Sequence, residues 1–447
     1  MHRTNGTLLR AALALIGPLT IAGAQEPPPM SVLFENVRIF DGVNDRLSDP
    51  ANVLVAGNVI RRISSTTTAD PAESAVLVIQ GEGRTLMPGL IDNHWHTLLA
   101  RSSPTDLLEG DMGYANLVAS LEAEATLMRG FTAVRDLGGP SFGLKRAIDE
   151  GIAVGPRIYP SGAMITVTGG HGDFRSPAEL PRQLGGPPSR METRNGSLLA
   201  DSPDEVRVRV REQLLLGASQ IKLTAGGGVA SPHSPLDVST FTEDELKAAV
   251  EAAENWGTYV TVHAYTPAAI QRAVAAGVRV IEHGHLLDEA TAQLIAESDV
   301  WLSFQPFTDD GYAPPLAPAN LVRLEQVWSG TEKTIALAKR YDIKVAFGTD
   351  ILFSPIGGER QAFELVKMSK WYSAAETLTM ATSVNGELLK LSGPRDPYPG
   401  KLGAVEEGAL ADLLLVDGDP LADIRLLEDP AKLMVIMKDG RIYKNAL

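Results

Sequence analysis

The 447-residue sequence contains no cysteine. Disulfide bonds, thiolate nucleophiles, iron–sulfur clusters and cysteine-based zinc sites are therefore excluded. If the protein binds a metal ion, the ligands must be histidine, aspartate, glutamate or a less usual group.

Positive charge is in short supply, because 40 lysines and arginines face 55 aspartates and glutamates, a net charge of −15 at pH 7. An acidic surface repels phosphate backbones, so we expect no nucleic-acid partner. The composition, 44% hydrophobic and 21% charged, is typical of a globular protein and excludes fibres and intrinsic disorder. The length suits a barrel of about 250 residues and a second domain.

Long apolar runs are also missing, and the longest candidate lies at the N-terminus. Arg3 and Arg10 precede an apolar stretch at 11–22. Ala22-Gly23-Ala24 then supplies the small residues of a cleavage site before Gln25. This pattern predicts a signal peptide over residues 1–24, since a retained membrane helix needs about 20 apolar residues. We expect an exported protein, periplasmic or secreted, without membrane attachment after cleavage. The alternative is a disordered extension, and an intact Met1 on the exported protein would contradict cleavage.

The two ends of the mature chain share a strand-rich texture. Each end is too small to form its own core, so we expect the ends to pair as a small β-sandwich. Its N-terminal part is residues 25–88 and its C-terminal part is residues 395–447. The expected strands lie at 32–40, 53–63, 75–80, 411–417, 432–437 and 441–444.

Residues 89–394 alternate between apolar runs and helical patterns. Three helix starts carry the capping pattern of Ser or Thr followed three residues later by Glu, at Ser202, Thr242 and Ser373. Eight strands that each lead into a helical crossover predict an α/β fold, a (β/α)8 TIM barrel. The eight runs are 90–96, 130–137, 157–163, 219–224, 258–264, 278–284, 300–305 and 343–349.

Polar side chains gather at the C-terminal ends of these runs, where barrel enzymes keep their active sites. One such histidine is more often structural, but a buried polar cluster without an ion costs about 2–7 kcal/mol for each unpaired group. The cluster therefore predicts a metal site. His94 and His96 share one strand face and can bind one ion together. The predicted members are His94, His96, Lys222, His263, His283 and Asp350.

This order of residues resembles the metal-dependent amidohydrolase superfamily. The resemblance covers nearly the whole mature chain and includes His-x-His after Pro88-Gly89-Leu90-Ile91-Asp92, and the segment 408–416. Two further segments, 168–173 and 221–228, resemble the imidazolonepropionase-related branch. That branch contains the Xaa-Pro and Xaa-Arg carboxypeptidase-like enzymes and ochratoxinase.

The resemblance implies a binuclear site of known layout. Two divalent metal ions would be held there, with zinc favoured by the ligand types and manganese, cobalt or iron left open. Two cations activate a water for attack on an amide, and Asp350 would carry its proton to the leaving amine. The implied ligands are His94, His96 and Asp350 for the α ion, His263 and His283 for the β ion, and Lys222, carbamylated by CO2, for both.

Two more residues are expected on the substrate side. His171 lies in a glycine-rich loop, and its alternative is packing against Asp173. Tyr265 could donate a hydrogen bond to the carbonyl oxygen or oxyanion. We expect His285 to lie behind the ligands and leave His233 unassigned.

The expected substrate is a small-molecule amide. Arg175, Arg190 and Arg194 follow His171 and favour an anionic substrate end. The alternative is that these arginines are solvated and pair with Glu179 or Glu192. The branch implies N-acyl amino acids or dipeptides with a free C-terminal carboxylate, including ochratoxin A with release of phenylalanine, and a homo-oligomeric assembly. The alternatives are a cyclic amidase or lactonase on the same scaffold, and a metal-free structural relative.

Overall fold

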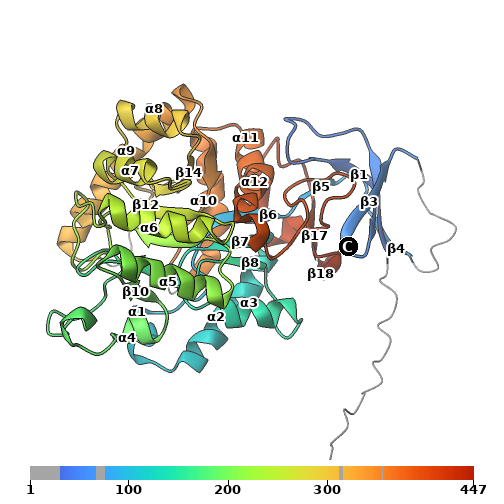
Figure 1. Ribbon diagram of the computed structural model, residues 1–447. Coiled ribbons are helices and arrows are strands. Elements are labelled where there is room, and N and C mark those ends of the chain that lie inside the picture. The colour runs from blue at the N-terminus through green and yellow to red at the C-terminus, as the bar shows by residue number, and fades with distance from the viewer. Residues whose placement is uncertain (1–30, 67–75, 312–315, 355) are drawn as a thin grey trace, which may run out of the picture.

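The computed structural model describes residues 31–66, 76–311, 316–354 and 356–447 (Figure 1). The predicted signal peptide lies outside these residues. Within them, no helix combines the length and apolarity that crossing a membrane requires. The chain forms a helix-rich body beside a smaller part made of strands (Figure 1).

Strands from both ends of the chain form the smaller part, as predicted. They belong to one eight-stranded sheet in the order β18-β17-β16-β5-β1-β2-β3, with β4 beside β1. The two ends join where β5 and β16 run antiparallel, Leu413 opposite Pro88. Phe34, Leu86 and Leu415 belong to one shared core, which explains why neither end needs a core of its own.

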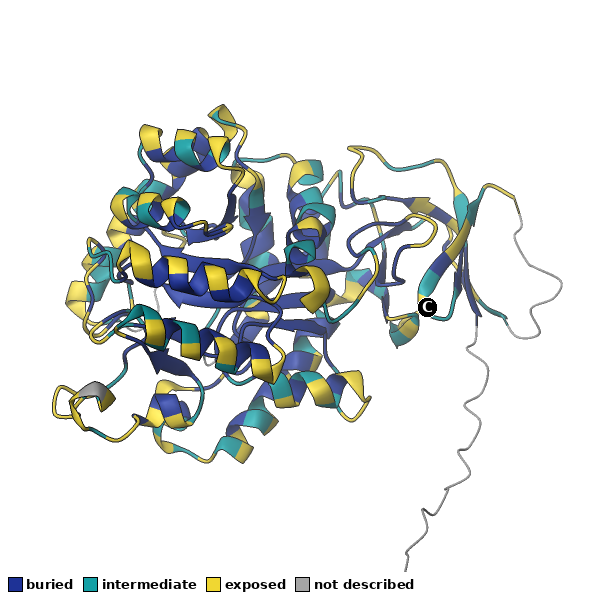
Figure 2. Cartoon of the chain, viewed as in Figure 1, coloured by how far each residue is buried: buried dark blue, intermediate teal, exposed yellow. Residues whose placement is uncertain are grey.

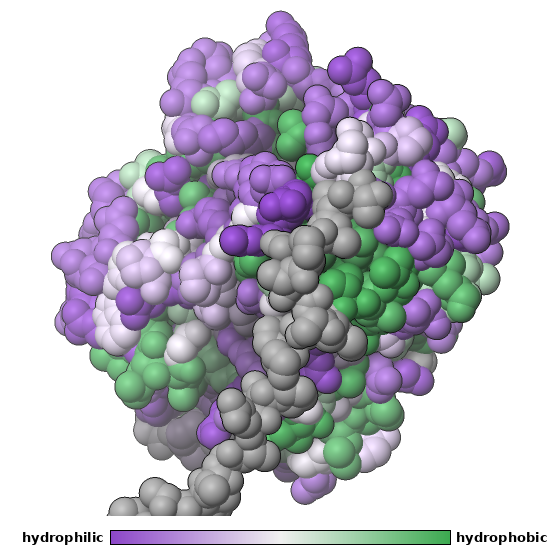
Figure 3. Space-filling view, turned by 90° about the vertical axis from the view of Figure 1, so that its right-hand side faces the viewer, coloured by the Kyte–Doolittle hydropathy of each residue, from purple (hydrophilic) through white to green (hydrophobic). Residues whose placement is uncertain are grey.

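The face of the molecule on this side carries polar residues with apolar residues gathered in patches between them (Figure 3). The strands are β1 (Ser31–Ile39), β2 (Ala51–Ala56), β3 (Val59–Ser64), β4 (Val76–Gln80), β5 (Thr85–Pro88), β16 (Leu413–Val416), β17 (Leu433–Lys438) and β18 (Arg441–Asn445).

The body contains parallel strands in two sheets. One sheet has the order β6-β7-β8 and the other β10-β9-β11-β12-β13-β14-β15. Every predicted apolar run contains one of these strands. The strands are β6 (Leu90–Trp95), β7 (Phe131–Asp136), β8 (Arg157–Pro160), β9 (Met164–Thr166), β10 (Ser197–Leu199), β11 (Ile221–Thr224), β12 (Val260–Ala264), β13 (Val280–His283), β14 (Trp301–Phe304) and β15 (Val345–Phe347).

This arrangement is an α/β fold like a TIM barrel, although its described strands do not form one closed ladder. The third run ends early, and β8 pairs with β7 while β9, a few residues later, pairs with β11. At the opposite seam, β15 and β6 are linked by the Asp350 backbone N–H, which donates to the His94 carbonyl at 2.7 Å. The seam therefore brings two proposed metal ligands together.

Helices cover the outside of the strands, with exposed outer faces and buried inner faces (Figure 2). The three predicted helix starts are confirmed, because Ser202, Thr242 and Ser373 each cap a helix. The α-helices are α1 (Pro104–Glu109), α2 (Met112–Met128), α3 (Phe142–Asp149), α4 (Arg190–Thr193), α5 (Pro203–Leu216), α6 (Glu243–Glu254), α7 (Pro267–Ala275), α8 (Glu289–Glu297), α9 (Pro318–Arg340), α10 (Gln361–Lys367), α11 (Ala374–Thr379) and α12 (Asn385–Leu389).

Six short 3-10 helices and one π-helix complete the described body and C-terminal region. They are η1 (Arg182–Leu184), η2 (Gly357–Arg360), η3 (Met368–Lys370), η4 (Met380–Val384, a π-helix), η5 (Lys390–Arg395), η6 (Ile424–Glu428) and η7 (Pro430–Lys432).

The packing of β11 shows how the fold directs side chains into the site. Ile221 and Leu223 belong to the same apolar cluster as Val210 of α5 and Leu246 of α6. Because side chains alternate along a strand, Lys222 between them points the other way, into the interior of the body. Its side chain is buried there with only 2% exposed.

Candidate metal centre and active site

The predicted histidines and Asp350 come together at the C-terminal ends of the strands. The ring centroids of His94 and His96 are 5.3 Å apart, and those of His94 and His283 are 5.0 Å apart. His263 lies 4.4 Å from His283 by the same measure. Side chains from strands far apart in the sequence thus share one buried space.

Three of these residues have the geometry of a metal site. Ligand atoms of His94, His96 and Asp350 all lie within 4.8 Å of one another. Asp350 Oδ1 is 3.2 Å from His94 Nε2 and 3.0 Å from His96 Nε2. Burial favours protonation of Asp350, but the histidines around it, His94 above all, together outweigh burial and hold the pKa of Asp350 well below its usual range. An ionised carboxylate is the form that binds a cation.

The other two histidines each hydrogen-bond the protein through one ring nitrogen. His263 Nε2 donates to the Gly227 carbonyl at 3.0 Å. His283 Nδ1 donates to Gln305 Oε1 at 2.7 Å, and its Nε2 has no hydrogen-bond partner in the described chain. Burial lowers the pKa of both histidines well below the usual range. They are therefore neutral, the form in which imidazole binds metals.

Lys222 completes the predicted set. Burial lowers the pKa of its amine to about 8. The Nζ atom finds no hydrogen-bond partner among the described residues, and neither do His96 Nδ1 and His283 Nε2. Buried polar atoms are normally paired, and unpaired ones need an explanation. A donor set of imidazole nitrogens, a carboxylate and an unpaired buried amine fits divalent cations and a lysine that has been modified.

The two expected substrate-side residues lie against the ligand rings. The His171 ring stacks on His263 at 4.1 Å, and burial lowers the pKa of His171 to about 4. Its expected alternative partner, Asp173, pairs with Arg175 at 2.6 Å instead. The Tyr265 ring stacks on His283 at 4.7 Å. Both side chains therefore border the proposed metal site.

The three arginines expected after His171 each contact a protein partner. Arg175 is held by Asp173, and the exposed Arg190 lies 3.3 Å from Glu109. Arg194 donates to the Leu107 carbonyl of α1 at 2.5 Å. Arg175 Nη1 is nevertheless buried and finds no hydrogen-bond partner among the described residues.

The two remaining histidines of the body have structural contacts. His285 is buried, its Nε2 donates to the Gln305 carbonyl at 2.9 Å, and its ring stacks on Phe304. This placement behind His283 agrees with the expected supporting role. His233 Nε2 donates to the Arg175 carbonyl at 2.8 Å, linking two loops at this end of the body.

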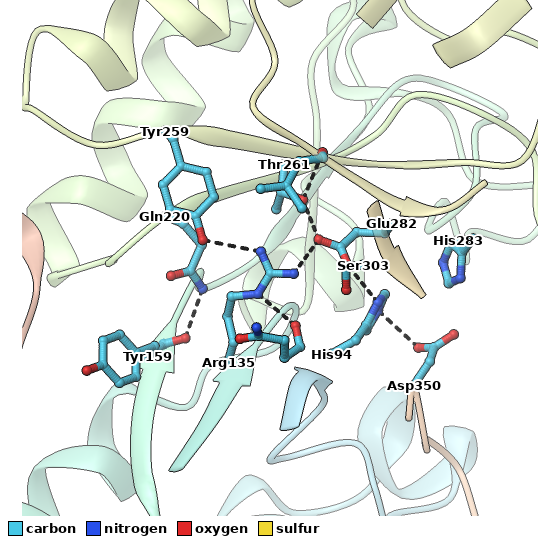
Figure 4. Close-up of polar contacts among 12 residues, drawn as sticks. His94, Arg135, Tyr159, Gln220, Tyr259, Thr261, Glu282, His283, Ser303 and Asp350 are labelled. Carbon is cyan, nitrogen blue, oxygen red and sulfur yellow. Dashed lines mark hydrogen bonds and ion pairs between the residues drawn. The ribbon is translucent and has the colours of Figure 1, made fainter. Parts of the chain in front are cut away.

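Sequence reasoning missed several residues beneath the ligands. Glu282 is completely buried and forms an ion pair with the equally buried Arg135 at 2.6 Å (Figure 4). Asp92 accepts the His94 backbone N–H at 3.1 Å and the Thr349 hydroxyl at 2.7 Å, beside the seam. The signal was present, since charged residues inside buried apolar strands need partners.

Comparison with known proteins identifies the family. Residues 85–443 match the amidohydrolase family. The protein belongs to the amidohydrolase family. Ochratoxinase of Aspergillus niger is 29% identical over 446 residues, covering 96% of this chain and 89% of the relative.

Solved structures support the same family assignment. The crystal structure of an amidohydrolase, 37% identical, has a TM-score of 0.84 and covers 94% of this chain and 100% of its own. A prolidase complexed with N-methylphosphonate-L-proline, 33% identical, also has a TM-score of 0.84, with 93% and 100% coverage. The protein is a hydrolytic enzyme that acts on amide bonds, and it resembles ochratoxinase.

Proposed function

We propose that this amidohydrolase uses two divalent metal ions to cleave the amide bond of N-acyl amino acids or dipeptides that carry a free C-terminal carboxylate. The observation that carries the proposal is the convergence of buried donor atoms that lack protein partners. Lys222 Nζ and His283 Nε2 are the clearest cases. Together with the His94, His96 and Asp350 group, they make a site suited to two cations.

The proposed roles follow from the positions of the side chains. His94, His96 and Asp350 would hold one ion and His263 and His283 the other. Lys222 would reach both after its neutral amine attacks CO2 and releases a proton, which leaves a carbamate with two oxygens. When bound, such ions lower the pKa of water and polarise a carbonyl group, and zinc is the metal that these ligands favour.

Asp350 is the candidate proton carrier. Its side chain is 16% exposed, whereas those of His94 and His96 are 1% and 4% exposed, so its carboxylate is the group most open to an incoming substrate. It would accept a proton from the attacking water and pass it to the leaving nitrogen. Tyr265 and His171, against the ligand rings, would contact the substrate carbonyl side.

The substrate class rests on the relatives and on the aromatic wall of the site. The prolidase was solved with an L-proline derivative, and the ochratoxinase supplies the second comparison. Tyr265 and Phe307 share an apolar cluster with Leu236. This cluster suits an apolar group beside the amide, as in ochratoxin A, from which the enzyme would release phenylalanine.

The metal proposal is tested by metal analysis and by Lys222→Ala. We expect about two ions per wild-type chain, and in Lys222→Ala a loss of activity together with reduced metal content. Short carboxylic acids should restore part of the activity because they replace the missing oxygens. Lys247→Ala, on an exposed face of α6, is the control. Full activity in Lys222→Ala, or well under one ion per wild-type chain, would refute the proposal.

The substrate proposal is tested by comparing a free acid with its methyl ester. For N-acyl-phenylalanines and dipeptides we expect a higher kcat/KM for the acid. If the ester were cleaved as fast as the acid, the proposed recognition of the free carboxylate would be wrong. Turnover of cyclic amides or lactones without linear amides would establish the cyclic amidase or lactonase alternative.

Export and assembly stay predictions. We propose an exported enzyme that forms a homo-oligomer, with no nucleic-acid partner. N-terminal sequencing of the exported protein should give Gln25 as the first residue. Light scattering of the purified enzyme should give a multiple of the monomer mass, and a monomer mass would contradict the oligomer.

A further inference from the structure

A buried ion pair crosses the interior of the body directly beneath the proposed metal centre. Arg135 comes from β7 in the three-stranded sheet, and Glu282 comes from β13 in the seven-stranded sheet (Figure 4). Arg135 Nη2 donates to Glu282 Oε1 at 2.6 Å, and both side chains have 0% exposure. This contact links the two sheets beside His94.

The remaining contacts hold both members of the pair in one arrangement. Arg135 Nε donates to the Asn93 carbonyl at 2.7 Å, and Nη1 donates to the Tyr259 hydroxyl at 3.2 Å. The Thr261 hydroxyl donates to the same Glu282 Oε1 atom. Oε1 is therefore fully engaged, and the carboxylate can rotate little.

The second carboxylate oxygen is directed at a proposed metal ligand. Glu282 Oε2 lies 2.9 Å from His94 Nδ1, within ion-pair distance, and it accepts no hydrogen bond from any described residue. On the opposite edge of the ring, His94 Nε2 lies 3.2 Å from Asp350 Oδ1. The imidazole thus stands between two carboxylates, those of Glu282 and Asp350 (Figure 4).

The Glu282 carboxylate favours one tautomer of His94. A carboxylate beside Nδ1 favours a proton on that atom, which leaves the lone pair on Nε2, facing Asp350 and His96. Carboxylate partners of this kind orient metal-binding histidines and raise their basicity. Gln305 Nε2 also lies 3.2 Å from Nδ1, and because an amide nitrogen can only donate, this contact favours the opposite tautomer. The Glu282 carboxylate is charged and lies nearer to Nδ1, at 2.9 Å.

We propose that Glu282, anchored by Arg135, is a positioning residue that holds His94 with Nε2 turned toward the α metal ion. The inference rests on the proposed metal site and extends it to a pair of residues outside the ligand set. The competing explanation is that the ion pair serves only to join the two sheets. The two explanations differ in what happens when both charges are removed together.

The test measures zinc affinity by competition with a chelator in the wild-type enzyme, Glu282→Gln, and the double variant Arg135→Gln with Glu282→Gln. We expect zinc at one of two sites to be weakened about 10–100-fold in both variants, because each lacks the carboxylate beside His94. The second site should keep its ion. The double variant leaves no unpaired charge at this buried pair, so zinc affinity can be measured in it if the single variant folds poorly.

Asp412→Asn provides a matched control, because Asp412 is also a buried carboxylate paired with an arginine, Arg157, but at the boundary with the terminal sheet. It should lower stability without changing zinc affinity. Wild-type affinity in Glu282→Gln, or its recovery in the double variant, would overturn the positioning role. A wild-type enzyme that binds no zinc would instead overturn the proposed function together with this inference.

Discussion

Asp350 shows how one residue can serve both the backbone and the chemistry. Its φ angle is 54°, in the left-handed region, just after β15 ends. Aspartate and asparagine tolerate this conformation better than most residues. The turn allows the carboxylate to face His94 and His96, while the backbone N–H remains bonded to the His94 carbonyl.

Asp350→Asn therefore removes the charge without straining the backbone. We expect kcat to fall about 10²–10⁴-fold, the range associated with losing a general acid–base group. Weaker metal binding should accompany the loss, so kcat is measured at saturating zinc. The control is Asp342→Asn, at another left-handed aspartate with a φ of 52°, beyond the end of α9. A kcat within twofold of wild type for Asp350→Asn would contradict the proton-carrier role.

At the scale of elements, two loops meet over the site. The loop after β9 carries His171, and the loop after β11 carries Gly227 and Gly228. An added Cβ at Gly228 would lie 2.3 Å from His171 Nδ1, so only glycine lets the two loops approach this closely. Arg323 of α9 holds the second loop by donating to the Ser231 carbonyl at 3.0 Å.

Gly228→Ala should therefore push the His171 ring away from His263. We expect kcat/KM to fall about 10²-fold, since displacements near 1 Å in an active site have effects of this size. Thermal unfolding should show a folded protein. Gly143→Ala is the matched control, because its added Cβ meets nothing within 4 Å. If Gly228→Ala keeps wild-type kcat/KM, the contact between the loops has no role in catalysis.

At the scale of the whole molecule, the sequence predicted the architecture well because local signals agreed with the fold. The eight apolar runs contain strands, and capping residues such as Thr242 mark helix starts. Side-chain alternation placed Lys222 in the interior. The break after β8 was not predictable, because periodicity within a run carries no information about which neighbour each half will pair with.

The ion-pair partners of charged residues were the second feature that the sequence did not predict. Arg175 looked available for a substrate carboxylate, but in the folded chain it pairs with Asp173, two residues away. Glu282 was visible as a charge before His283, yet its partner Arg135 lies on a strand far away in the sequence. Composition and spacing can locate a site, whereas the ion pairs that surround it depend on distances that only the folded chain defines.

The terminal sheet is fastened to the body by a buried ion pair. Arg157 of β8 donates to both carboxylate oxygens of Asp412, at 2.9 and 3.0 Å, and Asp412 lies just before β16. The Lys438 amine donates to the Gly155 carbonyl at 2.7 Å beside them. The charged groups buried at this boundary are therefore paired between the terminal sheet and the body.

Asp412→Ala should lower the free energy of unfolding by about 1–3 kcal/mol, because Arg157 loses two buried hydrogen bonds and keeps Asp439, at 2.7 Å, as its carboxylate partner. Urea titration followed by circular dichroism measures the change. Asp423→Ala, which breaks the exposed Asp423–Arg425 pair, should have a much smaller effect because solvent screens that pair. Equal losses in the two variants would mean that the Arg157–Asp412 contact does not fasten the sheet. A large loss confined to Asp412→Ala, with zinc affinity unchanged, would place this pair in the fold and outside the metal centre.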